Sequence, residues 1–189
     1  MILTGERLLL EPLTRADAPA LHRLLHDPET TRYMVLGRTG PSAERWLAEL
    51  ADGWPRQVAW GVKFGVEPPP LKPFGVVGLW DLDWLARKAE FRIVLGDYRG
   101  GGFGVEATRL VLAYAFTALN LERVWLGTAA ENVAARKCFE KCGFLQEGVL
   151  IQDFLGPDGR RGDNVRYAIL KPRWEALIYE TRKIEERTE

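Results

Sequence analysis

A glycine-rich loop between a strand-like and a helix-like segment holds the residues best suited to chemistry. The apolar run Ile93–Leu95 leads into Arg99-Gly100-Gly101-Gly102-Phe103-Gly104, and a helical pattern follows from Val105. Glycines allow close approach of a ligand, and the N–H groups and dipole of a helix N-terminus stabilise negative charge. We interpret the loop as a cradle for a phosphate or pyrophosphate, with Arg99 as a charged donor. The alternative is a purely structural turn.

Two known phosphate-binding patterns fit this loop poorly. Gly102-x-Gly104-x-x-Ala107 matches the loose dinucleotide pattern. A dinucleotide fold, however, normally opens with this loop and carries an acidic residue at the end of the next strand, whereas Glu122 precedes that strand. Neither Gly100 nor Gly101 leads to the Lys-Ser or Lys-Thr pair of an ATP-binding P-loop. NAD and ATP are therefore disfavoured as ligands.

Other chemistry-bearing residues have simpler interpretations. His22 and His26 have metal-like spacing, but Arg23 stands where a zinc-protease helix carries glutamate, so we predict surface histidines and no metal. Ser42 is interpreted as a helix cap, because no Ser-His-Asp arrangement surrounds it. Cys138 and Cys142, four residues apart, read as part of a buried helical stripe.

The elements that must position the loop follow from the apolar pattern, prolines and glycines. It predicts strands at 7–12, 58–66, 74–84, 90–95, 123–128, 144–154 and 164–170, and helices at 14–26, from 41, at 105–119, at 132–142 and from 172. This mixed order indicates an α+β fold with a partly parallel central sheet flanked by helices. We expect one domain over residues 1–189, with 172–189 as a charged C-terminal helix.

Composition narrows the function classes. The 189 residues include 26 basic and 26 acidic side chains, so no global charge attracts nucleic acid or an anionic membrane. The longest apolar run, residues 110–119, is far shorter than the roughly twenty residues that a membrane-spanning helix needs. The N-terminus lacks a secretory pattern, which predicts a cytoplasmic protein. The scarcity of serine, asparagine and glutamine indicates a thermostable one.

Two linked motifs resemble the GNAT superfamily of acyl-CoA-dependent N-acetyltransferases. They are Arg99-x-x-Gly102-x-Gly104 after a strand, and a helix that opens at Asn132 and ends in Glu140-Lys141-Cys142-Gly143-Phe144. Further matching segments resemble the branch that includes ribosomal-protein N-terminal acetyltransferases: Arg7-Leu8-Leu9-Leu10-Glu11-Pro12-Leu13 followed by Asp17, Ala89-Glu90, and Glu106-Ala107. The resemblance extends from about residue 3 to 172.

The resemblance implies a GNAT fold in which two splayed parallel strands hold acetyl-CoA. The cofactor-binding residues that it implies are Ile93, Val94, Leu95, Arg99, Gly100, Gly101, Gly102, Phe103, Gly104, Val105, Asn132 and Arg136. The backbone amide of Leu95 would polarise the thioester carbonyl. Asn132 also fits a helix N-cap, and Arg136 also fits an exposed helical arginine.

Two positions depart from the family pattern. Many members carry a tyrosine where this chain has Phe139, and some close relatives carry a serine where it has Ala135. No general acid can be named there. Water supplies the proton, the site works mainly by positioning its substrates, or the chain binds acetyl-CoA without efficient turnover.

The acceptor side is less defined by sequence. Glu90 enters the strand that would polarise the thioester, so we predict it as the base or amine-positioning residue, with an edge-strand carboxylate as the alternative. Asp81 and Asp83 alternate with apolar residues on one strand face and could receive a cationic substrate, unless they belong to a solvated sheet face.

The predicted function is acetyl transfer from acetyl-CoA to a primary amine, and the first choice of acceptor is a protein N-terminal α-amine. Acetylation of a small amine such as a polyamine, an amino acid or an aminoglycoside is the first alternative. A non-catalytic acyl-CoA-binding regulatory domain is the second, and a dinucleotide-dependent enzyme is a remote third. The acceptor, the acyl-chain preference and the oligomeric state cannot be read from the residues, and a homodimer is kept open.

Overall fold

The structure is a computed structural model that describes residues 1–33, 45, 48, 54–65, 72–96, 98, 100–156 and 159–185, with the backbone alone at 182, 184 and 185. Two sequence predictions fall outside these residues: most of the helix that begins at Pro41-Ser42, and the predicted phosphate ligand Arg99.

The described strands form one eight-stranded sheet in the order β1-β2-β3-β4-β5-β6-β8-β7. Its strands are β1 (Leu3–Thr4), β2 (Leu8–Pro12), β3 (Val58–Phe64), β4 (Gly75–Asp83), β5 (Lys88–Leu95), β6 (Arg123–Ala129), β7 (Leu145–Leu155) and β8 (Arg161–Leu170). Neighbours pair antiparallel except β5 and β6, which are parallel. The predicted mixed sheet is therefore confirmed.

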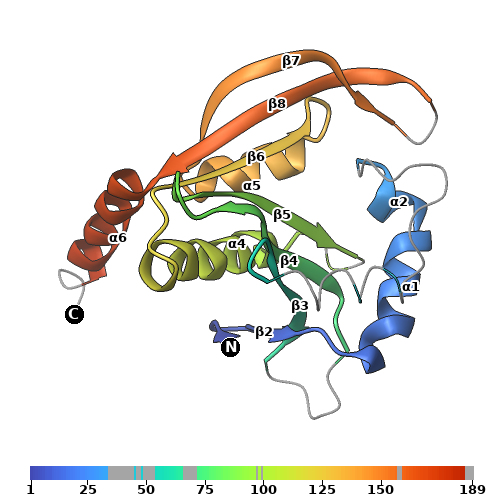
Figure 1. The fold of residues 1–189 in the computed structure, drawn as a ribbon, viewed down its shortest axis with the longest axis horizontal. Helices are drawn as coiled ribbons and strands as arrows, with labels where there is room; N and C mark the ends of the chain where they lie inside the picture. Colours follow the sequence, from blue (N-terminus) through green and yellow to red (C-terminus); the bar gives the residue numbers. More distant parts are fainter. Residues whose placement is uncertain are drawn as a thin grey trace.

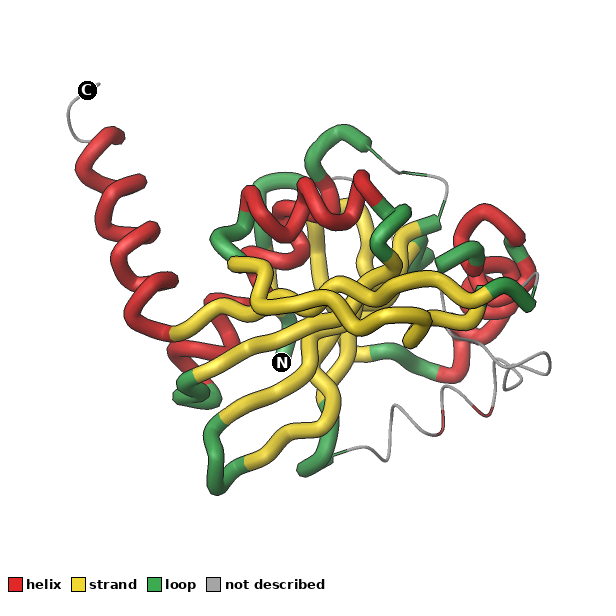
Figure 2. The backbone as a smooth tube through the Cα atoms, turned by 90° about the horizontal axis from the view of Figure 1, so that it is seen from above, coloured by secondary structure: helices red, strands yellow, loops and turns green. Residues whose placement is uncertain are grey.

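Helices cover both faces of this sheet (Figures 1 and 2). On one face, α4 (Phe103–Ala113) and α5 (Val133–Lys141) pack over the main core, to which β4 contributes Val77 and Leu79. On the other face, η1 (Arg15–Asp17) leads into α1 (Ala18–His26) and α2 (Pro28–Thr31), and α1 packs against Val76 and Trp80. Because both faces of β4 are covered, its sequence is almost continuously apolar.

Both boundaries of the helix predicted at 105–119 differ in the structure, for physical reasons. The helix predicted from residue 105 begins at Phe103, because Gly102 adopts φ +83 and serves as its N-cap. It also ends differently, since a π-helical turn, η2 (Tyr114–Ala118), follows α4 and brings Tyr114 edge-on to Trp60.

The C-terminal helix α6 (Lys171–Glu185) extends from the end of β8 (Figure 1). It packs through Trp174 against Phe116, with ring centroids 5.4 Å apart. No helix in the described part of the chain is both long and apolar enough to cross a bilayer.

Candidate functional site

A wedge opens between the two parallel strands. β5 and β6 pair only at Lys88–Arg123, Ala89–Val124 and Glu90–Trp125, although both strands continue beyond these pairs. Figure 1 shows them diverging toward their C-terminal ends. Ile93, Val94 and Leu95 lie in the diverging part of β5 while their other edge stays paired with β4, so an extended ligand can pair with the edge that faces β6.

The glycine loop at the end of this wedge has the backbone of an anion cradle. Gly100, Gly101 and Gly102 have φ angles of +94°, +59° and +83°, in the left-handed region that disfavours every residue with a Cβ atom. Among the described residues, no heavy atom lies within 4 Å of a Cβ built on Gly100. The loop is thus open on one side and leads directly into the N-terminus of α4.

The other predicted residues of this loop have different neighbours. A Cβ on Gly104 would lie 3.2 Å from Cys138 Sγ, so this glycine allows α4 and α5 to pack closely instead of allowing a ligand to approach. The Phe103 ring packs edge-on against Phe64, with centroids 5.3 Å apart. The Val105 carbonyl faces the Cys142 thiol at 3.7 Å, and both cysteines are free, in keeping with their predicted packing role. Phe103, Gly104 and Val105 therefore offer a ligand mainly their backbone N–H groups.

A contact between Arg7 and Glu106, which the sequence did not predict, joins the chain before β2 to the glycine loop and the start of α4. Glu106, in the first turn of α4, accepts hydrogen bonds from the backbone N–H groups of Arg7 and Leu8 at 2.8 and 3.0 Å and from Arg7 Nε at 2.9 Å. Arg7 Nη1 donates to the Gly101 carbonyl at 2.7 Å. The only signal in the sequence was that both residues belong to the segments on which the family resemblance rests.

This contact makes the protein acid-sensitive at one carboxylate. Burial raises the pKa of Glu106, but the hydrogen bonds from Arg7 and Leu8 outweigh it, so the pKa lies below its usual value. A lowered folded-state pKa contributes stability above the unfolded value of about 4.5 and loses it as the pH falls through the folded value. We expect Glu106→Gln to lower the free energy of unfolding at pH 7 and to flatten its decline below pH 4.5, as measured by urea unfolding. An unchanged slope in acid would contradict this assignment.

The helix after β6, α5, has Asn132 as its N-cap and carries Arg136, and these are the two remaining residues predicted to bind acetyl-CoA. Asn132 caps α5 by accepting a hydrogen bond from the Ala135 N–H at 3.2 Å, which confirms its predicted cap role. Arg136 donates from Nε to the Tyr167 hydroxyl at 3.1 Å and from Nη1 to the Ala130 carbonyl at 3.2 Å. These bonds hold the guanidinium between α5 and β8, so a phosphate contact by Arg136 would have to be made alongside them.

Phe139 faces the core. It is 5% exposed, and its ring packs against Phe91 and Phe144. The neighbouring Tyr167 is fully buried, and its hydroxyl donates to Glu140 Oε1 at 2.9 Å. Burial is the main reason why the pKa of Tyr167 lies above its usual value. The Tyr167 hydroxyl is thus held by Arg136 and Glu140 and does not take the place of a tyrosine at position 139.

The predicted base Glu90 lies on the sheet face that carries α1. It pairs with Trp80 on β4 and with Trp125 on β6, so the three side chains share this face at the point where the wedge opens. The Glu90 carboxylate bonds Arg92 Nη2 at 2.5 Å, and its side chain is 15% exposed. The alternative of an edge-strand carboxylate is wrong, because β5 is an interior strand of the sheet.

Arginines cover both tryptophans of this face. The Arg92 guanidinium lies 5.5 Å from the Trp80 ring centroid, and the Arg166 guanidinium lies 4.3 Å from that of Trp125. Arg166 pairs across the sheet with Gly127, which has no side chain to keep it from reaching over β6. We call Trp80, Glu90, Arg92, Trp125 and Arg166 the acceptor row. Of these five residues, the sequence indicated only Glu90, since strand register brings the other four beside it.

The two predicted substrate aspartates do not share a regular strand face. The register shifts between Trp80 and Asp83, and Asp81 has φ +49°, so simple alternation stops there. Asp83 accepts a hydrogen bond from the Ala86 N–H at 2.8 Å and pairs with Lys88, which gives it a role in the β4–β5 turn. Asp81 is exposed, and its role as a substrate ligand stays a prediction.

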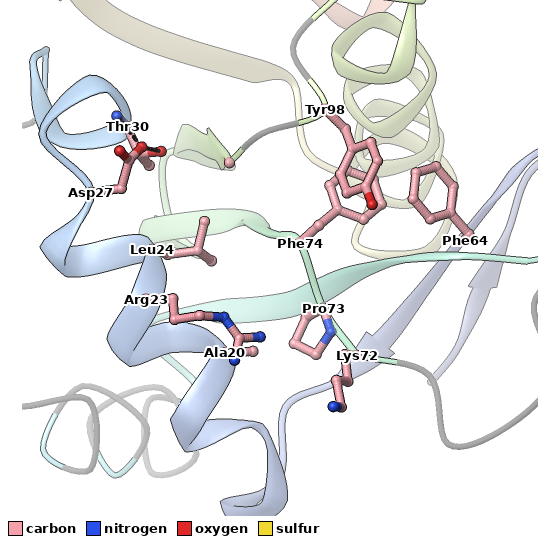
Figure 3. Close-up of a pocket in the computed structure, with 11 residues that line it drawn as sticks. Ala20, Arg23, Leu24, Asp27, Thr30, Phe64, Lys72, Pro73, Phe74 and Tyr98 are labelled. Carbon is pink, nitrogen blue, oxygen red and sulfur yellow. Dashed lines mark hydrogen bonds between the residues drawn. The ribbon is translucent and has the colours of Figure 1, made fainter.

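A cavity of about 350 Å³ lies between α1 and the adjoining ends of β3, β4 and β5 (Figure 3). Arg23, Lys72, Phe74 and Tyr98 are among its lining residues, and the rings of Phe74 and Tyr98 lie 5.1 Å apart. It adjoins the glycine loop in sequence, but its described lining residues include none of Gly100–Gly104 and none of the acceptor row.

Comparison with known proteins identifies this arrangement. The family model described as "Acetyltransferase (GNAT) domain" matches residues 7–145. The chain belongs to the GNAT acetyltransferase family. Among solved structures, it is similar to a spermidine N-acetyltransferase from Vibrio cholerae in complex with CoA and spermine, with a TM-score of 0.80, 28% identity, and coverage of 90% of this chain and 99% of the other.

Two curated relatives illustrate the range of GNAT acceptors. A spermidine N(1)-acetyltransferase from Vibrio cholerae is 35% identical over 113 residues, which are 59% of this chain and 65% of that enzyme. A protein from Bacillus subtilis named "Putative ribosomal N-acetyltransferase YdaF" is 32% identical over 173 residues, which are 88% of this chain and 91% of YdaF.

This protein is accordingly a GNAT-type N-acetyltransferase whose acyl donor is acetyl-CoA. Within the described residues, no three His, Cys, Asp or Glu side chains are grouped so that they could hold a metal.

Proposed function

We propose that this GNAT protein acetylates a protein N-terminal α-amine. The observation that carries the proposal is the charge of the acceptor row. A polyamine carries several positive charges and favours a surface of unpaired carboxylates, whereas Glu90 is paired with Arg92, and Arg166 adds a further positive charge to the same face. A peptide N-terminus carries its carbonyl oxygens beside the amine, and these accept hydrogen bonds from arginine.

The proposed site residues divide between the two reactants. Acetyl-CoA supplies an activated acetyl thioester. The N–H groups of Gly100 to Val105 bind its pyrophosphate, the diverging edge of Ile93–Leu95 binds its arm, and the Leu95 N–H polarises the thioester carbonyl. Glu90 positions the amine and accepts its proton, directly or through water.

The proton balance also favours an α-amine. An α-amino group with a pKa of about 7.7–8.0 is roughly 10–20% neutral at pH 7, whereas a lysine-like amine near 10.4 is neutral at about the 0.04% level. The second substrate would need roughly 4.6 kcal/mol of additional help. With Glu90 as the one carboxylate in the acceptor row, the less basic amine is the better match.

A small amine is the second candidate, because three relatives are named spermidine N(1)-acetyltransferases and one similar structure holds spermine. In support of a protein N-terminus, YdaF, which matches 88% of this chain, is named a putative ribosomal N-acetyltransferase. We further propose that residues 1–189 act as one domain in the cytoplasm, and that the protein is thermostable, which a melting curve tests.

The test is thiol release from acetyl-CoA with short peptides, polyamines and aminoglycosides as acceptors. We expect turnover with peptides that have a free N-terminus, and none with the same peptides after N-terminal blocking. Blocked peptides that contain lysine are the control, because they retain a side-chain amine. Turnover with polyamines alone would refute the protein N-terminus, and CoA binding without any turnover would favour a regulatory domain.

A further inference from the structure

We propose that Arg7 is a positioning residue that turns the glycine loop toward the pyrophosphate of acetyl-CoA. The proposal rests on the proposed role of the loop as the pyrophosphate site. It assigns to the residue just before β2 a task that the loop itself cannot perform, because three consecutive glycines have little conformational preference of their own.

The first argument is the direction of one peptide unit. Arg7 Nη1 donates to the carbonyl of Gly101 at 2.7 Å. In a planar trans peptide, the carbonyl oxygen of one residue and the N–H of the next point in opposite directions. By holding the Gly101 carbonyl, Arg7 therefore directs the Gly102 N–H in the opposite direction within the peptide plane, away from its own guanidinium.

The second argument is that the guanidinium is itself fixed. Its Nε donates to Glu106 Oε2 at 2.9 Å, and its central carbon lies 4.6 Å from the Phe103 ring centroid. A Cβ on Gly102 would lie 3.4 Å from its Nη2. The rigid fork thus connects a residue of the first turn of α4 to the loop that precedes it. A lysine ammonium is a point charge and cannot reproduce this two-sided contact.

Orientation, more than charge, is the expected effect. The Arg7 side chain is 46% exposed, so solvent screens its attraction to phosphate. The loop needs support because its three glycines hold a left-handed backbone that they would readily leave. Without Arg7, the loop N–H groups no longer share one direction, and the affinity for the diphosphate part of the donor falls.

The test compares Arg7→Lys with wild type by isothermal titration of CoA and by turnover with two donors. We expect the Kd of CoA to rise about tenfold or more. This corresponds to the loss of one charge-assisted hydrogen bond between a loop N–H group and the phosphate. With S-acetylpantetheine, which has no pyrophosphate, kcat/KM should stay within about twofold. The KM for the acceptor and kcat at saturating acetyl-CoA should also be unchanged. Arg109→Lys on α4 is the matched control, since its guanidinium contacts the Lys141 carbonyl at 3.5 Å and not the loop.

Arg7→Ala with added ethylguanidinium covers the case in which the lysine variant folds poorly. Partial recovery of CoA binding supports the proposal, and no recovery in a folded variant overturns it. An unchanged CoA Kd in Arg7→Lys, or an equal loss with both donors, also overturns it. A failure of the proposed loop itself looks different, because wild type would then show no preference for acetyl-CoA over S-acetylpantetheine.

Discussion

Gly102→Val should weaken acetyl-CoA binding by at least about tenfold while leaving the protein folded. Valine is strongly disfavoured at the φ of +83° that Gly102 adopts, since a left-handed backbone costs about 1–2 kcal/mol for a residue with a Cβ atom. Its branches would also point toward Arg7 Nη2. The loop then leaves the geometry that presents its N–H groups, and isothermal titration of CoA measures the loss.

Gly148→Ala is the control for this loss. It removes a glycine that has no left-handed φ, and a Cβ there meets no described heavy atom within 4 Å. We expect its CoA affinity to match that of wild type. Gly104→Val is a poorer test, because its side chain would collide with Cys138 Sγ and disturb the packing of α4 on α5. A folded Gly102→Val protein with unchanged CoA affinity would remove the loop from the cofactor site.

Glu90→Gln should lower kcat by about 100-fold and change the Kd of CoA by less than about twofold. Positioned acid–base groups contribute about 10²–10⁴-fold to rates, and glutamine keeps the shape of glutamate but cannot accept the proton. The change also breaks the ion pair with Arg92, which frees that guanidinium beside Trp80. Steady-state rates of thiol release, taken from pH 6 to 9, measure the effect.

Glu147→Gln offers a matched control for this substitution. It likewise removes a glutamate that is paired with an arginine, but Glu147 lies on β7 and its partner Arg123 begins β6, before the wedge opens. We expect its rates to equal those of wild type. Wild-type activity of Glu90→Gln at every pH in this range would exclude the glutamate from the mechanism.

The glycine loop and the order of strands and helices were predictable because their signals are local. A glycine cluster between an apolar strand and an apolar helix has few structural uses, and the helix that opens at Asn132 carries its own cap. The wedge was predictable only through the family resemblance. Nothing in the apolar pattern of β5 and β6 shows where their pairing stops.

The acceptor row and the Arg7 contact were beyond the sequence for a different reason. Arg7 and Glu106 are 99 residues apart, and only the finished fold brings β2 beside the first turn of α4. Trp125 and Arg166 meet through the register of β6 on β8, opposite a glycine that leaves room for the arginine. At Asp81 and Asp83 the sequence was misleading. Regular alternation predicted that the two aspartates share a strand face, but a register shift and the positive φ of Asp81 interrupt the alternation.

The most direct test of the central claim is a competition in one vessel. Equal concentrations of spermidine and of a short peptide with a free N-terminus, blocked at any lysine, compete for limiting acetyl-CoA, and mass spectrometry gives the ratio of the two acetylated products. The charge of the acceptor row predicts that the peptide product predominates and that its share falls in Arg166→Ala. Predominance of acetylspermidine in the wild-type reaction would contradict the proposed acceptor and assign this GNAT enzyme to small-amine acetylation.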